Sequence, residues 1–390
     1  MRRILGMTSI RSEYDLMSGV YRRLARDPDV EFKLLVSGAH LSPAFGRSVD
    51  LIHQDGLEIL SEVETLISGD SKASRLKTAS GLLTSALDVV RGYRPDMLIY
   101  AGDREDVLIG AMLGAFLDIP TVHFFGGDHA ADGHVDNPVR HATSKLSTAH
   151  FVSIKEHAQR LAHLGEDPHR VFVIGSVALD KFVAEPPLDR TSTLLSLGAK
   201  PHAMAGAPLA ILIFHPVDQE RELAPDYVRD AVSTLVERGY HVLIGAPNAD
   251  PGNAALLSAM QEVAQAPEVT FYGNTARAFF VNLMRHAALM VGNSSAGLLE
   301  AASVRLPVIN LGERQRGRLC GDNVVFSDGD ALSFRAALDH IASEEFLVGM
   351  RTLVNPYGDG HSEARAVDLL KRVDFKALFK KTEDPLNVHF

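Results

Sequence analysis

Apolar runs of strand length alternate with amphipathic stretches of helix length along most of this 390-residue chain. Such alternation predicts strands that are joined by helical crossovers, as parallel strands require. In the first half, the predicted strands are 3–8, 31–37, 96–101, 120–125, 150–153 and 171–174. The predicted helices of that half are 13–26, 107–117, 138–146 and 155–164. This order favours an α/β fold that is built on a doubly wound parallel sheet.

The pattern lapses over residues 182–208, which are rich in Pro, Ala, Gly and charged side chains and therefore indicate a linker. The alternation then restarts. Its predicted strands are 209–214, 241–244, 269–271, 288–291 and 307–310, and its predicted helices are 225–238, 254–264, 275–286, 295–303, 331–343 and 361–372. We therefore predict two Rossmann-like domains, over 1–181 and 205–360. Between two such domains we expect a ligand-binding cleft, at the carboxyl ends of the strands.

Composition and charge narrow the function. The 39 basic and 49 acidic residues give a net charge of −10, and no basic stripe runs along the chain, so no nucleic-acid partner is expected. No window approaches the ~20 apolar residues that cross a bilayer, so we predict a cytoplasmic protein without a membrane partner. Cys320 is the single cysteine, which excludes an internal disulfide and a cysteine-based zinc site. The 17 histidines lack metal-ligand spacing, so no metal or cofactor is predicted.

Three acidic side chains follow predicted strands of the first domain. Asp103 comes after the strand 96–101, and Asp128 and Asp136 flank a loop of small and acidic residues after the strand 120–125. Carboxylates at the mouth of a parallel sheet are partly desolvated, and neighbouring like charges push their pKa values apart, which suits proton abstraction and return. The alternatives are a helix cap for Asp103 and a polar surface loop for the other two.

Two further side chains are placed for anion chemistry at the ends of predicted strands. Arg11 lies in a turn between strand and helix that lacks the glycines of a dinucleotide site or a P-loop. Arg11 either binds a phosphate group or is part of an ordinary helix start. In the second case Glu13 is simply an acidic residue of the first turn, where its charge interacts favourably with the helix dipole. His215 ends a strand of the second domain, where it either protonates a leaving phosphate or hydrogen-bonds to a neighbouring loop.

The segment 291–297 leads from a predicted strand into a predicted helix of the second domain. It contains Asn293, Ser294 and Ser295, whose amides and hydroxyls suit a diphosphate. Glu300 follows one turn later, where it is placed to accept hydrogen bonds from ribose hydroxyls. The alternative is an ordinary serine-capped helix.

The segment 312–318 concentrates positive charge in an otherwise acidic chain. Its Arg314 and Arg318 are candidate cations for a bound anion, and the alternative is a solvated run of charges.

Taken together, these segments resemble the UDP-N-acetylglucosamine 2-epimerase family, and within it the hydrolysing branch that feeds sialic and legionaminic acid synthesis. The matching segments occur in the family's order and are Arg11-Ser12-Glu13-Tyr14, His40-Leu41-Ser42-Pro43 with Phe45-Gly46, Gly102-Asp103-Arg104, Gly126-Gly127-Asp128, Val135-Asp136 with Arg140-His141, Ser144-Lys145-Leu146-Ser147, His215-Pro216-Val217, Gly292-Asn293-Ser294-Ser295 with Gly297 and Glu300, and Gly312-Glu313-Arg314-Gln315 with Gly317-Arg318. The His-Leu-Ser-Pro and Gly-Asp-Arg segments favour the hydrolysing branch.

The resemblance implies a GT-B architecture, in which the helix and tail of residues 361–390 return to the first domain. It also implies two chemical steps: loss of the C2 proton and UDP to give a 2-acetamidoglucal, then addition of water to release N-acetylmannosamine. The implied catalytic residues are Asp103, Asp128, Asp136 and His215. The implied substrate-binding residues are Arg11, Asn293, Ser294, Ser295, Glu300, Arg314 and Arg318. A UDP-linked amino sugar and UDP are the implied ligands, and a homo-oligomer is plausible for the family.

One departure from the family concerns the sugar. Asp128 stands where the family usually has a glutamate that is one methylene longer, so the substrate is either N-acetylglucosamine or a 2,4-diacetamido-6-deoxy relative linked to UDP or GDP. Two other functions remain as alternatives. A GT-B glycosyltransferase would share the nucleotide-sugar site, but that function does not explain the three acids of the first domain. A nucleotide-sugar sensor would bind the same ligand without converting it.

Overall fold

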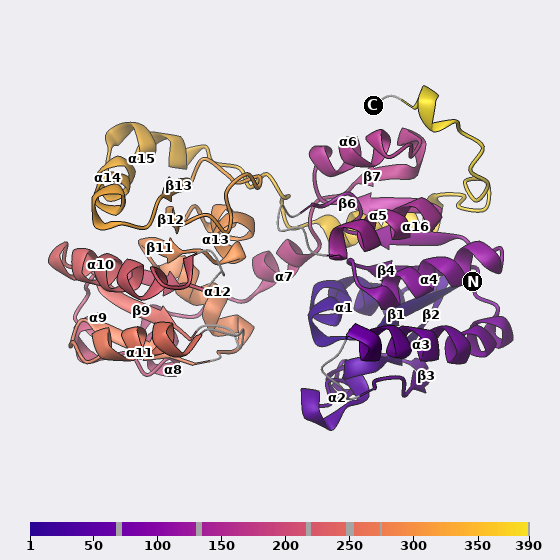
Figure 1. Cartoon of the computed structure of the whole chain (residues 1–390), viewed down its shortest axis with the longest axis horizontal. Coiled ribbons are helices and arrows are strands. Elements are labelled where there is room, and N and C mark those ends of the chain that lie inside the picture. Colours follow the sequence, from indigo (N-terminus) through magenta and orange to yellow (C-terminus); the bar gives the residue numbers. More distant parts are fainter. Residues whose placement is uncertain (68–71, 130–134, 216–219, 247–252, 274, 389–390) are drawn as a thin grey trace. The chain divides into compact units, whose positions relative to one another are not determined.

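The computed structural model describes residues 1–67, 72–129, 135–215, 220–246, 253–273 and 275–388. The chain forms two compact units, of which unit 1 comprises Met1–Lys181 with Gly360–Phe390 and unit 2 comprises Phe182–Asp359. Each unit contains one parallel sheet with helices packed on it (Figure 1). The predicted doubly wound parallel sheets are thus confirmed. Within the described residues, no helix combines the length and the apolar character needed to span a bilayer.

Unit 1 is built on a seven-stranded sheet in the order β3-β2-β1-β4-β5-β6-β7. Its strands are β1 (Arg2–Thr8), β2 (Val30–Ser37), β3 (Ile59–Val63), β4 (Met97–Ala101), β5 (Thr121–Phe124), β6 (Ala149–Val152) and β7 (Val171–Val173). Its helices are α1 (Arg11–Arg26), α2 (Val49–Gln54), α3 (Lys72–Tyr93), α4 (Glu105–Phe116), α5 (Asp136–Leu146), α6 (Lys155–His163) and α16 (Ser362–Arg372), and α7 (Ala178–Ala184) leads into unit 2.

The core of unit 1 lies on both faces of this sheet. Ile4 of β1 packs in a cluster with Met17 of α1, whereas its neighbour Leu5 packs in a second cluster with Leu82 of α3. Successive strand residues point to opposite faces, so a strand that is covered on both sides carries a continuous apolar run. β4 is buried at every position for this reason.

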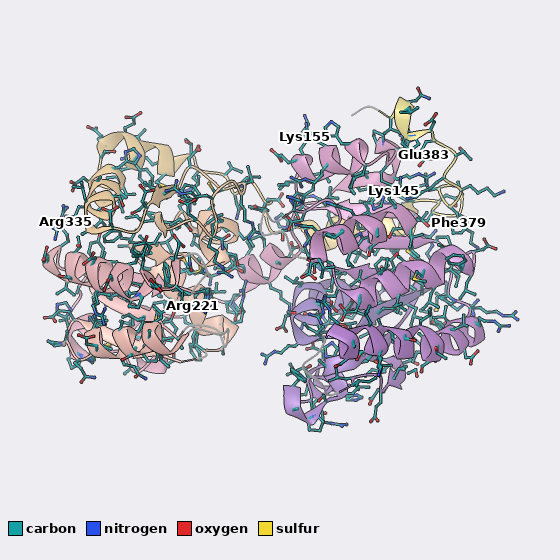
Figure 2. The ribbon with its side chains drawn as sticks, viewed as in Figure 1. Lys145, Lys155, Arg221, Arg335, Phe379 and Glu383 are labelled. Atoms are coloured by element: carbon teal, nitrogen blue, oxygen red, sulfur yellow. The ribbon has the colours of Figure 1, made fainter. Side chains whose placement is uncertain are left out.

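The segment that follows unit 2 returns to unit 1. Helix α16 packs on α1, and Phe375 beyond it contacts the rings of Phe151 and Phe172. Arg170 then donates hydrogen bonds to the carbonyl oxygen of Lys380 at 2.7 Å and to the carboxylate of Glu383 at 2.7 Å. Figure 2 labels Glu383 on this tail. The tail is therefore fastened to the sheet by both apolar and charged contacts.

A buried charged cluster fastens the same tail to α5. Glu166 is fully buried, and its carboxylate lies 2.8 Å from Nε2 of His150, 2.7 Å from Nζ of Lys145 and 2.5 Å from Nζ of Lys381. Lys381 also donates to the carbonyl oxygen of Lys145 at 2.9 Å. A fully buried carboxylate therefore meets two partly exposed lysine side chains at the carboxyl end of α5.

Unit 2 is built on a six-stranded sheet in the order β10-β9-β8-β11-β12-β13. Its strands are β8 (Leu209–Ile213), β9 (His241–Gly245), β10 (Val269–Tyr272), β11 (Leu289–Gly292), β12 (Val308–Leu311) and β13 (Val324–Ser327). Its helices are α8 (Arg190–Ser196), α9 (Pro201–Met204), α10 (Ala224–Glu237), α11 (Asn253–Val263), α12 (Arg277–His286), α13 (Ser295–Leu299), α14 (Ala331–Ile341) and α15 (Glu344–Arg351).

The predicted linker over 182–208 is wrong. This stretch contains α8 and α9, and its Phe182, Leu194 and Leu197 are buried in the core of unit 2. The turn residues that suggested a linker instead separate two short helices, and Pro201 occupies the first position of α9, where its missing N–H costs nothing. The predicted helix 295–303 is shorter, because α13 ends at Leu299 and a 3₁₀ turn follows.

Candidate active site

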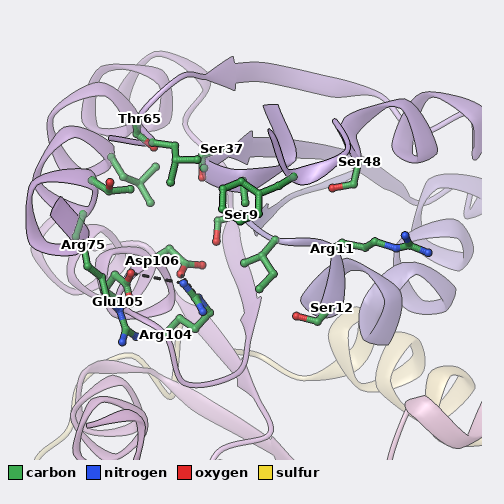
Figure 3. Close-up of a pocket in the computed structure, with 18 of the residues that line it drawn as sticks. Ser9, Arg11, Ser12, Ser37, Ser48, Thr65, Arg75, Arg104, Glu105 and Asp106 are labelled. Atoms are coloured by element: carbon green, nitrogen blue, oxygen red, sulfur yellow. Dashed lines mark hydrogen bonds and ion pairs between the residues drawn. The ribbon is translucent and has the colours of Figure 1, made fainter. Parts of the chain in front are cut away.

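Unit 1 contains a cavity of about 600 Å³ at the carboxyl ends of β1, β2, β3 and β4. This volume falls within the range of small-molecule sites, about 300–1,000 Å³. Figure 3 shows hydroxyl groups from the ends of three strands and charged side chains from α3 and α4 around it. The labelled polar residues are Ser9, Arg11, Ser12, Ser37, Ser48, Thr65, Arg75, Arg104, Glu105 and Asp106.

Apolar side chains form another part of the cavity lining. Phe45 and Ile67 line it although 65% and 44% of their surfaces are exposed. Arg11, which was predicted to bind the diphosphate, also lines the cavity, and its side chain is 68% exposed beside Asp15 at 3.5 Å. The cavity therefore offers both apolar surface and cations to a ligand.

Asp103 follows β4 and pairs with a buried arginine. The preceding Gly102 has a φ of +103°, which only glycine adopts readily. Arg140 of α5 donates to the Asp103 carboxylate, and its Nε and Nη1 are buried without a hydrogen-bond partner among the described residues. The N-cap of α4 is Arg104, without a side-chain cap, so Asp103 is not the helix cap that the alternative predicted.

His123 of β5 supports the same turn. Its Nε2 lies 2.7 Å from the carbonyl oxygen of Gly102, and its Nδ1 lies 3.0 Å from Oγ of Ser144. Burial lowers the pKa of His123 to about 3, so the ring is neutral and its Nε2–H donates to the carbonyl group. The backbone next to Asp103 is therefore fixed from the neighbouring strand.

Asp136 is the first residue of α5 and pairs with Arg75 of α3. Arg75 Nη2 lies 3.1 Å from Oδ1 of Asp136, and Arg75 Nε lies 2.6 Å from Oε2 of Glu105, the first residue of α4. One guanidinium group thus joins two acids at two helix starts. Because Arg75 and Glu105 line the cavity, this ion-pair network borders it.

Asp128, the third predicted acid, also lies at the carboxyl edge of the sheet. Its Oδ1 accepts a hydrogen bond from the backbone N–H of His129 at 2.8 Å and lies 3.3 Å from Nε2 of His157. Gly127 has a φ of +75°, and a Cβ there would lie 2.2 Å from the carbonyl oxygen of His157. This glycine therefore lets two segments of the backbone approach each other closely.

Two acids near the cavity have raised pKa values. Burial and then the charge of Asp106 raise the pKa of Glu13 well above its usual value. Burial likewise raises the pKa of Asp106. Glu13 accepts a hydrogen bond from the backbone N–H of Ser9 at 3.3 Å, and Ser9 and Asp106 line the cavity. Clusters of perturbed carboxyl groups are typical of functional sites.

In unit 2, Asn293 ties together the ends of three strands. Its fully buried side chain accepts from the backbone N–H of His215 and donates to the His215 carbonyl oxygen, both at 2.7 Å. Its own carbonyl oxygen accepts from Arg314 at 3.1 Å and Gln315 at 3.0 Å. The Asn293 side-chain amide is thus hydrogen-bonded to the protein backbone. Its predicted contact with substrate stays a prediction.

The remaining predicted residues of unit 2 surround the start of α13. Ser294 is the N-cap, and its Oγ accepts from the N–H of Ala296 at 3.3 Å. Arg318 donates to Oε1 of Gln315 at 3.0 Å, next to the backbone of Asn293. The structure therefore gathers Arg314 and Arg318 with the end of β11.

Glu300 follows α13 and pairs with Arg277 of α12. Arg277 Nη2 lies 2.8 Å from Oε1 of Glu300. Burial raises the pKa of Glu300, and the charge of Arg277 opposes this rise.

The cations that hold these acids were not predicted from the sequence. Arg75 and Arg277 were not singled out, and Arg140 was named only within a matching segment and without a role, although each pairs with a predicted site carboxylate. A predicted helix over α3 would have brought Arg75 to the carboxyl edge of the sheet. In the described part of the chain, no group of three or more His, Cys, Asp or Glu side chains is arranged to hold a metal ion.

The chain is similar to known proteins over most of its length. The family model described as UDP-N-acetylglucosamine 2-epimerase matches residues 22–371. A Legionella pneumophila protein named UDP-N,N'-diacetylbacillosamine 2-epimerase (hydrolyzing) is 30% identical over 96% of each chain. A Neisseria meningitidis protein named UDP-N-acetylglucosamine 2-epimerase is 29% identical over 88% of each chain. The solved structure of UDP-GlcNAc 2-epimerase from Neisseria meningitidis bound to UDP-GlcNAc has the same fold, with a TM-score of 0.76 and 17% identity over 95% of this chain and 100% of that one. The chain therefore belongs to the UDP-N-acetylglucosamine 2-epimerase family.

Proposed function

We propose that the chain is a hydrolysing 2-epimerase. It converts UDP-N-acetylglucosamine, or a related UDP-2-acetamido sugar, to UDP and a free N-acetylmannosamine-type sugar. The product feeds sialic or legionaminic acid synthesis, as the resemblance implies. The observation that carries the proposal is the pair of acids, Asp103 and Asp136, held by buried or half-buried arginines at one edge of the unit 1 sheet.

These acids suit the proton transfers of the reaction. One carboxylate takes the proton from C2 while the bond between C1 and the UDP oxygen breaks, which gives a 2-acetamidoglucal. Water then adds its oxygen to C1, and a proton returns to C2 on the opposite face. We assign these proton transfers to Asp103, Asp128 and Asp136. The same carboxylates stabilise the positive charge that develops on the sugar ring.

Unit 2 supplies the residues that we assign to the nucleotide. The departing UDP gains negative charge, which Ser294, Ser295 and Arg314 stabilise through hydrogen bonds and positive charge. His215 assists the departure as a proton or hydrogen-bond donor. The two hydrogen bonds between the Asn293 side chain and the His215 backbone fix that backbone, so the His215 side chain starts from a defined position.

A 2,4-diacetamido-6-deoxy sugar nucleotide is the second candidate substrate. The Legionella pneumophila relative carries a name of this kind and matches 96% of the chain. The exposed rings and methyl groups of Phe45 and Ile67 at the cavity suit a sugar with a methyl group at C6 and a second acetamido group.

Product identification tests the proposal. The purified protein is incubated in deuterium oxide with UDP-N-acetylglucosamine, and in parallel with UDP- and GDP-linked diacetamido sugars, and the products are identified by NMR. We expect release of the nucleoside diphosphate without an acceptor, and one deuterium at C2 of the free sugar. Retention of the original C2 hydrogen would reject the mechanism.

Other outcomes identify the alternatives. A requirement for a sugar acceptor indicates a glycosyltransferase, and tight UDP binding without turnover indicates a sensor. The matched control is Asp103→Asn, which we expect to abolish turnover and leave UDP binding unchanged, because Asp103 lies in unit 1 and the assigned nucleotide residues lie mainly in unit 2.

A further inference from the structure

Arg277 and Glu300 form an ion pair whose two members differ in burial. The bond joins Nη2 of Arg277 to Oε1 of Glu300 at 2.8 Å. The Glu300 side chain is 12% exposed, whereas that of Arg277 is 41% exposed. A partly exposed guanidinium group therefore contacts a carboxylate that is largely shielded from water.

The ion pair leaves most of the acceptor capacity of Glu300 unused. A carboxylate has about four lone-pair positions, and Arg277 fills one of them. The second oxygen, Oε2, is buried and has no hydrogen-bond partner among the described residues. A buried acceptor without a donor is costly, so a ligand that supplies donors is stabilised at this carboxylate.

The position of Arg277 is not explained by helix stability. Arg277 is the first residue of α12, and a cation at this end of a helix opposes the helix dipole. Its guanidinium group instead lies 5.7 Å from the ring centroid of the buried Phe182, which restricts its movement. The arginine is therefore held for its contact with Glu300.

We propose that Arg277 is a positioning residue that holds the Glu300 carboxylate as the acceptor for the hydroxyl groups of the nucleotide ribose. This inference rests on the proposed function, which supplies the nucleotide. A charged carboxylate accepts a hydrogen bond from each of two neighbouring hydroxyls, whereas a neutral carboxyl group has fewer acceptor positions. Arg277 thereby sets the preference of the site for a ribonucleotide over a 2′-deoxyribonucleotide.

Calorimetry of UDP and 2′-deoxy-UDP tests this role, because the two ligands differ only in one hydroxyl group. A hydrogen bond to a charged acceptor corresponds to about tenfold in affinity or more, so we expect this preference for UDP in the unaltered protein. In Arg277→Met the ratio of the two affinities falls towards one. Arg277→Lys retains the charge and keeps part of the ratio.

The control is Arg335→Met, which removes an ion pair of the same 2.8 Å length between Arg335 and Glu237 on the surface of unit 2. This variant keeps the full ratio. An Arg277→Met protein that binds both nucleotides more weakly but with an unchanged ratio overturns the inference, as does an unaltered protein that binds both equally. In either case UDP binding still supports the proposed function, whereas no binding of UDP at all refutes both. Melting curves of each variant check folding, and Arg277→Lys provides the answer if the methionine variant does not fold.

Discussion

Replacing Glu166 by glutamine tests the energetic role of the buried cluster that fastens the tail to α5. Burial raises the pKa of Glu166, but the hydrogen bond from His150, the charge of Lys381 and the hydrogen bond from Lys145 outweigh it and lower the pKa from 4.5 to about 2. Each unit of such a difference corresponds to about 1.4 kcal/mol of stability. The charged carboxylate therefore contributes about 3 kcal/mol to the free energy of unfolding of unit 1.

The sign of the pH dependence follows from the lowered pKa. Glu166 stabilises the folded state above about pH 4.5, where it is charged in both folded and unfolded chains. The contribution is lost as the pH falls towards 2, where the folded protein also takes up the proton. We expect Glu166→Gln to cost about 3 kcal/mol at neutral pH, and the difference from the unaltered protein to shrink in acid.

Urea unfolding followed by hydrogen–deuterium exchange measures this effect for each unit separately. Peptides from α5 and β6 report on unit 1, and peptides from unit 2 serve as an internal reference. The matched control is Glu58→Gln, because Glu58 pairs with Lys33 at the same 2.5 Å but is 63% exposed. An exposed pair contributes at most about 1 kcal/mol. Equal effects of the two substitutions, or a loss that does not change with pH, would refute the reasoning.

Two further predictions concern the carboxyl edge of the unit 1 sheet. Arg75→Met leaves the two acids that it joins without their shared cation, and we expect kcat to fall about 10- to 100-fold, while calorimetry shows unchanged UDP binding and Arg75→Lys recovers part of the rate. An unchanged kcat would contradict this role. Gly127→Ala places a Cβ 2.2 Å from the carbonyl oxygen of His157 and should lower the melting temperature more than Gly56→Ala, which has a similar φ of +70° but nothing within 4 Å. Equal melting temperatures would show that backbone strain, and not the close contact, sets the effect.

Periodicity predicted the central strands of both sheets because parallel strands that are covered on both faces carry continuous apolar runs. It missed β3 and β13, which are the edge strands of their sheets and are only half-buried. It also missed α15, which begins directly after the predicted helix 331–343 and has Ser343 as its N-cap. Burial at an edge and the exact end of a helix depend on neighbours that the local sequence does not contain.

The sequence could predict those site residues whose position is set by the end of a strand. Asp103 and His215 follow strands directly, so their position at the carboxyl edge is a local property of the sequence. The partners are not local: Arg75 is 61 residues from Asp136 and Arg277 is 23 residues from Glu300. Only the folded sheets bring these pairs together. Whether the predicted residues perform catalysis and binding stays a prediction for the experiments above.

Unit 1 is made of two segments that are far apart in the sequence, and this affects how it folds during synthesis on the ribosome. Unit 2 is one uninterrupted stretch, whereas unit 1 needs α16 and Phe375, which are made after unit 2. Folding during translation often proceeds from the amino terminus, but here the first unit waits for its last helix with apolar surface of α1 and β6 uncovered. Unit 2 can thus reach its native state before unit 1, and chaperones that shield nascent apolar surface would engage the earlier-made half for longer.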